Sequence, residues 1–318
     1  PLYGLDIHDS VKSTMKNNPK VKISIEKLNE SKELIENSYG NKLPTITSTI
    51  SGTYSNADKK TTTGDTTPET FTDKYKIKLN QNLYDGGFNN LEIERSKIIY
   101  DNEVLIFKNT IQNLILTAIE GYLSVINYKE SLEANKKNYD SVLKVLEEAK
   151  TLYELGSATL YDLQNAESAY ALAETNLFIA EQNYIISKKS FKRIVGKDPV
   201  KLEKVINFDE KLNFEDILSK ISTNNYDLLI LKNEINNKQL LLEKEKSTKK
   251  PSLDFSASAE FSDAGRIDNG SETTDGTISL TLTIPIFQQN IDNSNIRKYY
   301  SQLLQSELEY EDYLADWK

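Results

Sequence analysis

Acidic and basic side chains are abundant in this 318-residue chain, but they show none of the patterns that mark a catalytic or metal site. His8 is the single histidine, and no acidic or nucleophilic residue stands at a useful spacing from it, so we expect neither a metal nor a catalytic role there. The chain has no cysteine, which excludes disulfides, thiolate metal sites and cysteine nucleophiles. It also lacks a glycine-rich phosphate loop, a paired-carboxylate signature and a zinc-ligand spacing. The sequence therefore predicts no enzyme, no cofactor and no metal site.

The composition favours long solvated helices over a thick globular core. Lysine, glutamate and asparagine are abundant, whereas glycine and proline number only 12 and 7. The net charge of −9 gives no support to a nucleic-acid partner. No apolar run approaches the roughly 20 residues of a transmembrane helix. Because the chain starts at Pro1 without a methionine, we expect a mature or trimmed N-terminus whose signal peptide is not in this chain.

Residues 43–87 are expected to form a β-hairpin. Apolar side chains alternate with hydroxyl side chains over residues 45–54, and with lysine and asparagine over residues 74–83. Such period-two alternation over about ten residues is typical of a strand with one apolar and one wet face. A polar loop over residues 57–72 separates the two strands. A hairpin alone cannot bury its apolar face, so that face needs a partner.

Residues 88–195 are expected to form a long helical hairpin. Its first helix runs to about Leu155 and, at 1.5 Å per residue, would be on the order of 100 Å long. Apolar residues recur every seven positions in both arms, with a second row three residues later, which indicates a coiled-coil seam. Gly156 ends the first helix, and Thr159 with Asp162 resembles a capping box that opens the second.

The chain then repeats its opening pattern of helix, alternating hairpin and helix. Its expected segments are N-terminal helices (1–42), a first β-hairpin (43–87), the long helical hairpin (88–195), a connector (196–224), a helix (225–250), a second β-hairpin (251–290) and the start of a truncated helix (291–318). The second hairpin ends in Gln289-Asn290 where the first ends in Gly86-Gly87, so we expect its turn to be less sharp. The second helical hairpin of the duplication is expected to lie beyond Lys318.

Four strands of about ten residues, each with one apolar face, could cover that face in three ways. Packing on helices is disfavoured because the neighbouring helices already commit their apolar seams to each other, and a sandwich would need more strands. The third possibility is that the apolar face contacts lipid in a membrane barrel. A strand of ten residues, with a rise of about 3.3 Å per residue and a tilt of about 40°, spans roughly the 25 Å apolar band of an outer-membrane barrel. Four strands cannot close a barrel, so several copies must share one.

In such a barrel the apolar set of each strand should face lipid, and the threonine and lysine side should line water. The predicted lipid-facing residues are Ile46, Ile50, Tyr54, Tyr75, Ile77, Leu79, Leu83, Leu253, Phe255, Phe261, Ile278, Leu280, Leu282 and Ile284.

Several short motifs, taken in order, resemble those of TolC-type outer-membrane efflux proteins. They are Asn18-Pro19, Leu43-Pro44, Leu83-Tyr84-Asp85-Gly86-Gly87, Tyr153-Glu154-Leu155-Gly156, Asp162-Leu163-Gln164-Asn165-Ala166, Lys250-Pro251-Ser252-Leu253 and Ile284-Pro285-Ile286-Phe287. Each motif is weak alone, but the ordered set with its internal duplication covers nearly the whole chain. The resemblance implies a mixed α and β membrane protein. Three chains would form a homotrimer with a 12-stranded β-barrel in the outer membrane of a Gram-negative-type bacterium and a long α-helical barrel in the periplasm.

The resemblance also implies a function and two sites. Family members are passive exit ducts that dock on a periplasmic adaptor coupled to an inner-membrane pump and export drugs, toxins or proteins without catalysis. The turn Leu155-Gly156-Ser157 matches the hairpin tip that meets the adaptor, and Asp162 matches an acidic residue that helps latch the closed periplasmic entrance. The residues alone also allow plainer interpretations, with Gly156 as a turn residue and Asp162 as an acid favoured at a helix N-terminus.

A rival hypothesis is a structural or adhesive coiled-coil surface protein whose strands merely cap helical stalks. Extraction separates the two hypotheses. A duct should need detergent and run as a trimer, whereas a protein that is monomeric and soluble without detergent would contradict the duct.

Overall fold

The chain forms two compact units, each assembled from two separate stretches of sequence. The computed structural model describes residues 5–56, 59–61, 64–66, 69–203, 225–266 and 271–315. One unit consists of residues 1–27 with 106–224, and the other of residues 28–105 with 225–318. Most of the predicted connector, residues 204–224, lies outside the described residues. The unit boundaries fall inside two helices, which begin at Pro19 and Phe88.

The core of the first unit combines Tyr122 and Phe191 with Val125 and Val195. This unit holds α1 (Ile7–Asn17), α4 (Leu160–Val195), the start of α2 (Pro19–Gly40) and the later part of α3 (Phe88–Glu154). Tyr122 and Phe191 are almost fully buried, and their ring centroids lie 6.4 Å apart. The Tyr122 hydroxyl bonds the backbone carbonyls of Leu5 and Glu203 at 3.1 and 2.7 Å, as a buried tyrosine requires. Burial raises the pKa of Tyr122 because desolvation disfavours the phenolate.

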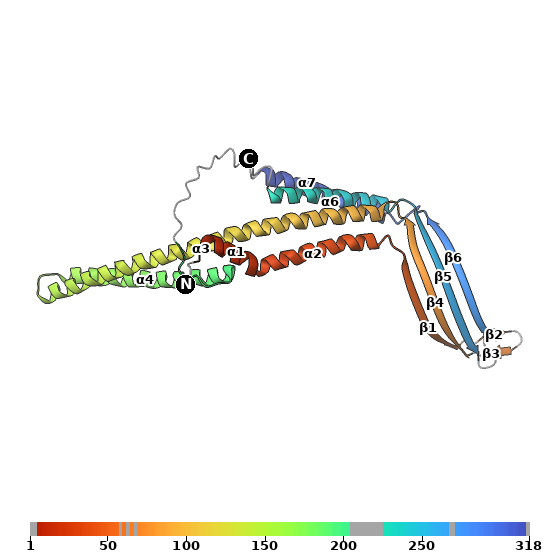
Figure 1. Cartoon of the computed structure of the whole chain (residues 1–318), viewed down its shortest axis with the longest axis horizontal. Helices are drawn as coiled ribbons and strands as arrows, with labels where there is room; N and C mark the ends of the chain where they lie inside the picture. Colours follow the sequence, from red (N-terminus) through yellow and green to blue (C-terminus); the bar gives the residue numbers. More distant parts are fainter. Residues whose placement is uncertain are drawn as a thin grey trace. The chain divides into compact units, whose positions relative to one another are not determined.

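The predicted helical hairpin is formed by α3 and α4 (Figure 1). Small residues of α4 are buried at intervals of seven: Ala166, Ala173, Ala180 and Ser187. On α3 the buried seam residues include Ala118, Val125 and Leu146. Tyr139 and Tyr170 meet across the seam, with their hydroxyl oxygens 2.9 Å apart. The heptad prediction is confirmed at these positions, although Tyr128 and Tyr153 of the same rows are 40% and 41% exposed.

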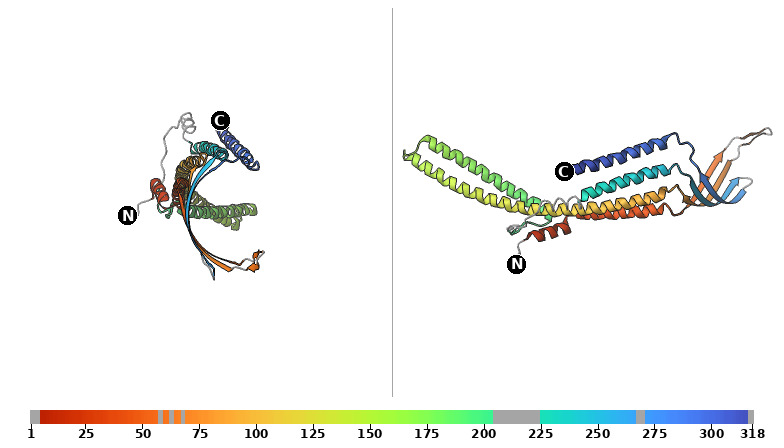
Figure 2. Two further views of the ribbon diagram at one scale, coloured as in Figure 1. Left: turned by 90° about the vertical axis from the view of Figure 1, so that its right-hand side faces the viewer. Right: turned by 90° about the horizontal axis from the view of Figure 1, so that it is seen from above.

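The second unit is built around a four-stranded antiparallel sheet in the order β1-β4-β5-β6. Its strands are β1 (Thr45–Asn56), β4 (Glu69–Tyr84), β5 (Ser252–Arg266) and β6 (Ser271–Thr283). Two short strands, β2 (Lys59–Thr61) and β3 (Gly64–Thr66), pair with each other in the stretch expected as a polar loop. The pairing of β4 with β5 joins the two repeats into one sheet. Figure 2 shows that this sheet is curved rather than flat.

Two helices of the second unit pack side by side (Figures 1 and 2). The first, α6 (Tyr226–Ser247), leads into β5, and the second, α7 (Ile291–Ala315), follows β6. Asn225 caps α6, because its side-chain oxygen accepts from the backbone N–H of Asp227 at 2.8 Å. Among the helices that the structure describes, none is long and apolar enough to cross a membrane.

The turn residues of the two repeats share a left-handed backbone, but β4 leads directly into its turn whereas residues 284–288 separate β6 from the second turn, so the expectation of a gentler second turn stays a prediction. Both central residues of each turn have positive φ: Gly86 (72°), Gly87 (95°), Gln289 (50°) and Asn290 (62°). In the first turn the N–H of Phe88 donates to the carbonyl of Asp85 at 3.3 Å, and in the second Ile291 donates to Gln288 at 3.0 Å. Non-glycine residues can occupy the left-handed region at a modest cost, so glycine is not required for this backbone.

Candidate membrane-facing and partner-facing surfaces

The register of the sheet brings the predicted lipid-facing side chains onto one face, except Ile284, which follows the end of β6 at Thr283 and has no partner in the register. Ile46 pairs with Leu79 and Ile50 with Tyr75 across β1 and β4. Tyr75 pairs in turn with Phe261 on β5, and their ring centroids lie 6.2 Å apart. The apolar pairs of β5 with β6 are Leu253–Leu282, Phe255–Leu280 and Ala257–Ile278. Because directly paired residues of neighbouring strands point to the same side, these pairs form one continuous apolar surface.

That surface is open in the single chain. Ile46, Ile50 and Ile278 are 69%, 73% and 79% exposed, whereas Leu79 is partly covered. Soluble monomers rarely expose contiguous apolar patches larger than about a few hundred Å². Within the described sheet, β1 and β6 pair on one side only, so the sheet also has two open edges. Both features point to a surface that is covered in the working protein.

A β-bulge shapes the helix-proximal end of this surface. The pairing of β4 with β5 shifts by one residue between Asn82 and Tyr84. The extra residue is Leu83, so Leu83 and Tyr84 together oppose Leu253. The bulge thereby places Tyr84 beside Leu83 and the apolar set, and both Leu83 and Tyr84 are about half exposed.

The opposite face of the sheet is polar. Lys74 and Lys76 on β4 reach the carboxylate of Glu260 on β5 at 3.5 and 3.1 Å. Thr47 on β1 pairs with Lys78 on the same face, and its hydroxyl donates to the Lys78 carbonyl at 3.4 Å. The sheet therefore has one apolar and one hydrated face, as the alternation predicts.

The tip between α3 and α4 is a helix C-cap turn. Gly156 has a φ of 73°, the left-handed conformation. The N–H of Ser157 donates to the carbonyl of Leu152 at 2.8 Å, and that of Gly156 to the carbonyl of Tyr153 at 3.0 Å, which are the bonds of a Schellman motif. Leu155 is 72% exposed. The interpretation of Gly156 as a turn residue is confirmed, and adaptor contact at this tip stays a prediction.

Asp162 lies in the first turn of α4 and closes a capping box. Its Oδ2 accepts from the Thr159 backbone N–H at 2.9 Å and from the Thr159 hydroxyl at 2.6 Å. In return, the Asp162 N–H donates to the Thr159 hydroxyl oxygen at 3.2 Å. Hydrogen bonds from the Thr159 side chain and backbone hold the pKa of Asp162 below its ordinary value. The capping prediction is confirmed, and a latch role stays a prediction.

An ion-pair cluster that the sequence did not single out joins α3 to α6. Glu92 accepts from Arg95 Nη2 and from Lys244 Nζ, both at 2.6 Å. The hydrogen bond from Arg95 is the largest cause that holds the pKa of Glu92 at about 2, and Lys244 adds to it against the desolvation of the carboxylate. Lys244 Nζ also lies 4.4 Å from the centre of the Phe88 ring. The spacing of Glu92 and Arg95 predicts a local helix pair, but no local signal predicts Lys244.

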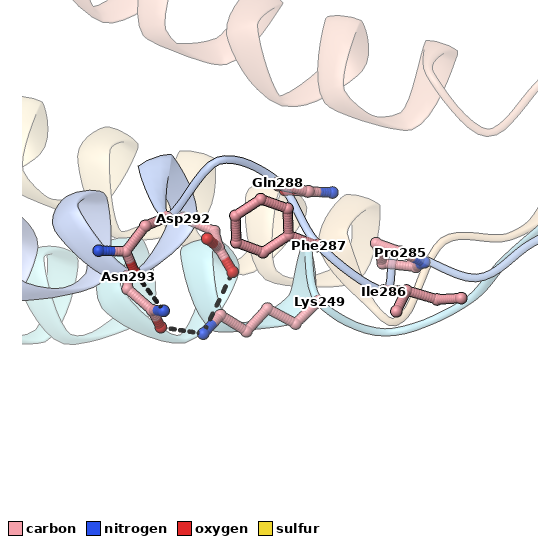
Figure 3. Close-up of a pocket in the computed structure, with 8 residues that line it drawn as sticks. Lys249, Pro285, Ile286, Phe287, Gln288, Asp292 and Asn293 are labelled. Carbon is pink, nitrogen blue, oxygen red and sulfur yellow. Dashed lines mark hydrogen bonds and ion pairs between the residues drawn. The ribbon is translucent and has the colours of Figure 1, made fainter.

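A second cluster recurs at equivalent places in the two repeats. Lys42 and Lys249 each stand two residues before the proline that opens a hairpin. Lys42 Nζ donates to the side chain of Asn90, and Lys249 Nζ donates to that of Asn293. Lys249 also pairs with Asp292 at 3.2 Å, as the dashed lines in Figure 3 mark. The repeated Lys-Pro spacing was the only sequence signal for this cluster. Among the described residues, no group of three or more acidic or histidine side chains could hold a metal ion.

The chain belongs to the outer membrane efflux protein family, whose model matches residues 11–197. It is therefore a protein of the outer membrane that extends into the periplasm, and its family is one of channels rather than enzymes. It is 26% identical over 128 residues to the outer membrane efflux protein BepC of Brucella suis, which is 40% of this chain and 28% of BepC. It is 22% identical over 202 residues to the outer membrane protein TolC of Escherichia coli, which is 59% of this chain and 41% of TolC. The chain thus matches less than half the length of these curated relatives.

Solved structures agree on the fold. The CmeC outer membrane channel of Campylobacter jejuni superposes with a TM-score of 0.78 at 17% identity, over 98% of this chain and 68% of CmeC. The outer membrane protein VceC of Vibrio cholerae superposes with a TM-score of 0.76 at 12% identity, over 98% of this chain and 75% of VceC. The predicted combination of a long helical hairpin with two β-hairpins is confirmed, and the family favours an efflux protein over a coiled-coil stalk.

Proposed function

We propose that this chain is a subunit of a passive outer-membrane export duct in which three copies share one β-barrel. The observation that carries the proposal is the continuous apolar face of a curved four-stranded sheet with two open edges. Three such sheets would supply twelve strands, which lies within the range of about 8 to 26 found in outer-membrane barrels. Pairing of β6 with β1 of the next copy would satisfy the edge groups that lipid cannot.

In this arrangement the apolar set defined by Ile46, Leu79 and Ile278 faces lipid. The face that carries Lys74, Lys76 and Glu260 then lines the water-filled duct, because the two faces of one sheet cannot share an environment. Ion pairs on that face suit a hydrated wall through which cargo passes without being bound.

The helical hairpin would extend the duct into the periplasm. With 67 residues, α3 is on the order of 100 Å long, which is several times the thickness of a bilayer core. The tip exposes Leu155, Leu160 and Tyr161 by 72%, 53% and 71%. Such an apolar tip suits contact with a periplasmic adaptor and, through it, an inner-membrane pump. Asp162, just beyond the tip, is the proposed latch residue of the closed entrance.

Two neighbouring substitutions on β4 test the membrane assignment. Leu79→Arg puts a charge on the lipid face, which costs about 2–4 kcal/mol at the bilayer midplane, whereas Lys78→Glu changes a charge on the hydrated face. We expect detergent-extractable trimer in outer-membrane fractions to fall about tenfold or more for Leu79→Arg and by less than about twofold for Lys78→Glu. Equal losses, or a wild-type chain that is a monomer soluble without detergent, would contradict the proposal.

A further inference from the structure

The two repeats carry matching hollows at the point where each β-hairpin meets the following helix. The hollow of the first repeat has a volume of about 360 Å³. Lys42 and Asp85 supply its charges, and Leu83 with Tyr84 supplies its apolar wall. Tyr84 is half exposed, and it lies beside the apolar face of the sheet through the bulge opposite Leu253.

The hollow of the second repeat has the same kinds of wall, but its acid stands elsewhere, since counted from the turn Asp292 corresponds to Asn89 and Asp85 to Gln288. Its volume is about 200 Å³. Lys249 and Asp292 supply its charges, and Ile286 with Phe287 supplies its apolar wall (Figure 3). Ile286 is 95% exposed and Phe287 80% exposed. Counted back from the turn, Phe287 corresponds to Tyr84 and Ile286 to Leu83. Each repeat therefore has an aliphatic residue followed by an aromatic residue at this place.

Each hollow therefore presents one cation and one anion beside an exposed apolar wall. A lysine ammonium has three donors, of which Lys249 uses two on Asp292 and Asn293, while the bond that Lys42 makes to Asn90 uses one. Desolvation is the largest single influence on Asp292 and disfavours its charged form. The hydrogen bond and charge of Lys249, together with backbone hydrogen bonds, act in the opposite direction and keep the pKa of Asp292 below its ordinary value. The Asp292 carboxylate is therefore ionised at neutral pH, and each lysine keeps at least one donor that the described bonds do not use.

The size and position of the hollows narrow the choice of ligand. A water takes about 30 Å³ in the liquid, so these volumes hold a group the size of about seven to twelve waters and lie near the low end of drug-binding cavities, at roughly 300 Å³. The hollows lie at the end of the sheet from which the helices leave, directly beyond the apolar rows. If those rows lie in hydrocarbon, the hollows lie at the level of lipid headgroups, where lysine and aromatic side chains are favoured.

We propose that each hollow binds the headgroup of a zwitterionic aminophospholipid in the leaflet that faces the helices. The lysine ammonium bonds the phosphate, the carboxylate of Asp85 or Asp292 bonds the lipid ammonium, and the aliphatic and aromatic wall covers the start of the acyl chains. The opposite charges of headgroup and hollow match one to one, which a purely anionic lipid would not achieve. This inference rests on the proposed membrane placement of the sheet.

Native mass spectrometry of the trimer tests this proposal. The full chain is reconstituted in nanodiscs of equimolar phosphatidylethanolamine and phosphatidylglycerol, released, and the lipids retained by each trimer are counted. We expect phosphatidylethanolamine to be enriched in the native protein. In the double variant Lys42→Ala/Lys249→Ala its retention should fall about fivefold, while Lys78→Ala, on the hydrated sheet face, should match the native protein. Unchanged retention in the double variant, or equal retention of the two lipids by the native protein, would overturn the proposal.

A second variant keeps the test decisive if the double variant fails to assemble. Asp292→Asn removes the partner of the lipid ammonium in the second hollow but leaves Lys249 and the first hollow, so the preference of the trimer for phosphatidylethanolamine over phosphatidylglycerol should fall by about twofold. A merely structural role would lower the retention of both lipids alike and would refute the headgroup site. Failure of the duct itself has a different signature, because a chain that forms no detergent-requiring trimer would retain no lipid of either kind.

Discussion

The two strand-to-helix turns of this chain share a backbone but not a sequence. Gly86-Gly87 in the first and Gln289-Asn290 in the second all have positive φ. A Cβ on Gly86 would lie 2.7 Å from both the Lys250 Cβ and the Ser247 carbonyl oxygen. Gln289, in contrast, is exposed and holds a whole side chain at the corresponding place.

The difference shows what each turn requires. A sharp turn from strand to helix needs the left-handed backbone in both repeats, whereas glycine is needed only where another segment approaches. The first turn packs against the link from α6 to β5, and the Lys250 side chain bonds the Gly86 carbonyl at 3.1 Å. The second turn follows an edge strand, which has no such neighbour in the described sheet.

The two repeats also differ in their charged residues, one turn into the helices that follow, α3 and α7. The first repeat carries Glu92 and Arg95, which bind Lys244 across the helix pair. At the corresponding positions of the second repeat stand Asn295 and Lys298. The ion-pair cluster thus lies where α3 of the first repeat contacts α6 of the second within one chain.

Gly86→Ala should be the most destabilising substitution at the two turns. An alanine there costs about 1–2 kcal/mol for the left-handed backbone, and the contact with a backbone oxygen adds about 1–3 kcal/mol because the α6–β5 link must shift. We expect the detergent-solubilised protein to unfold at a markedly lower temperature in circular dichroism.

Gly87→Ala is the matched control, since no atom lies within 4 Å of a Cβ on Gly87 although its φ is 95°. Its loss of stability should be limited to the backbone cost of about 1–2 kcal/mol. If the two variants melt alike, close packing is not what distinguishes the first turn.

Glu92→Gln should have the next largest effect, because it leaves Lys244 and Arg95 without their shared carboxylate. The Glu92 side chain keeps 18% of its exposure, so we expect a loss of about 1–2 kcal/mol, below the roughly 3–5 kcal/mol for breaking a fully buried pair. Glu94→Gln, on the exposed side of the same helix turn, should change stability by less than about 0.5 kcal/mol. Thermal unfolding of the two variants measures the difference, and equal losses would show that the cluster adds no stability.

The pH dependence of unfolding gives a second test of this cluster. The folded-state pKa of Glu92 is about 2, below its ordinary value of 4.5. A lowered carboxyl pKa stabilises the fold fully above the ordinary value, and this stability is lost as pH falls from 4.5 through 2. The acid-induced loss of stability should therefore be shallower in Glu92→Gln than in the native protein. Parallel pH profiles would contradict the assignment.

Gln289→Gly should have the smallest effect on stability, and any change should be a gain rather than a loss. Glycine relieves the left-handed strain of Gln289 but increases the freedom of the unfolded chain, so the two terms largely offset and the protein should be unchanged or gain up to about 1 kcal/mol. A clear loss in thermal unfolding would mean that the Gln289 side chain makes a contact that the turn needs.

Local periodicity made most of the fold predictable. Alternation with period two placed all four long strands, and the heptad rows placed buried Ala118 and Ala173, because burial is written into such spacing. The capping box of Thr159 and Asp162 was predictable for the same reason, since its members are three residues apart.

Features that depend on distant partners were not predictable. The contact of Glu92 with Lys244 joins residues 152 positions apart, and no single sequence marks it. The left-handed backbone of Gln289 was not predictable from a count of glycines, because Gln289 is exposed and its side chain meets no close segment there. The hollow beside Lys249 likewise appears only when the ends of α6 and β6 are brought together.

The orientation of the sheet is the central claim, and cysteine labelling on β4 tests it most directly. Because the chain has no native cysteine, Ile77→Cys, Lys78→Cys, Leu79→Cys and Asn80→Cys each introduce a single thiol. In intact outer membranes a water-soluble thiol reagent should modify positions 78 and 80 quickly, and positions 77 and 79 only after the protein is denatured. Equal modification of all four positions in the intact membrane would contradict a sheet with one face in lipid and the other in water.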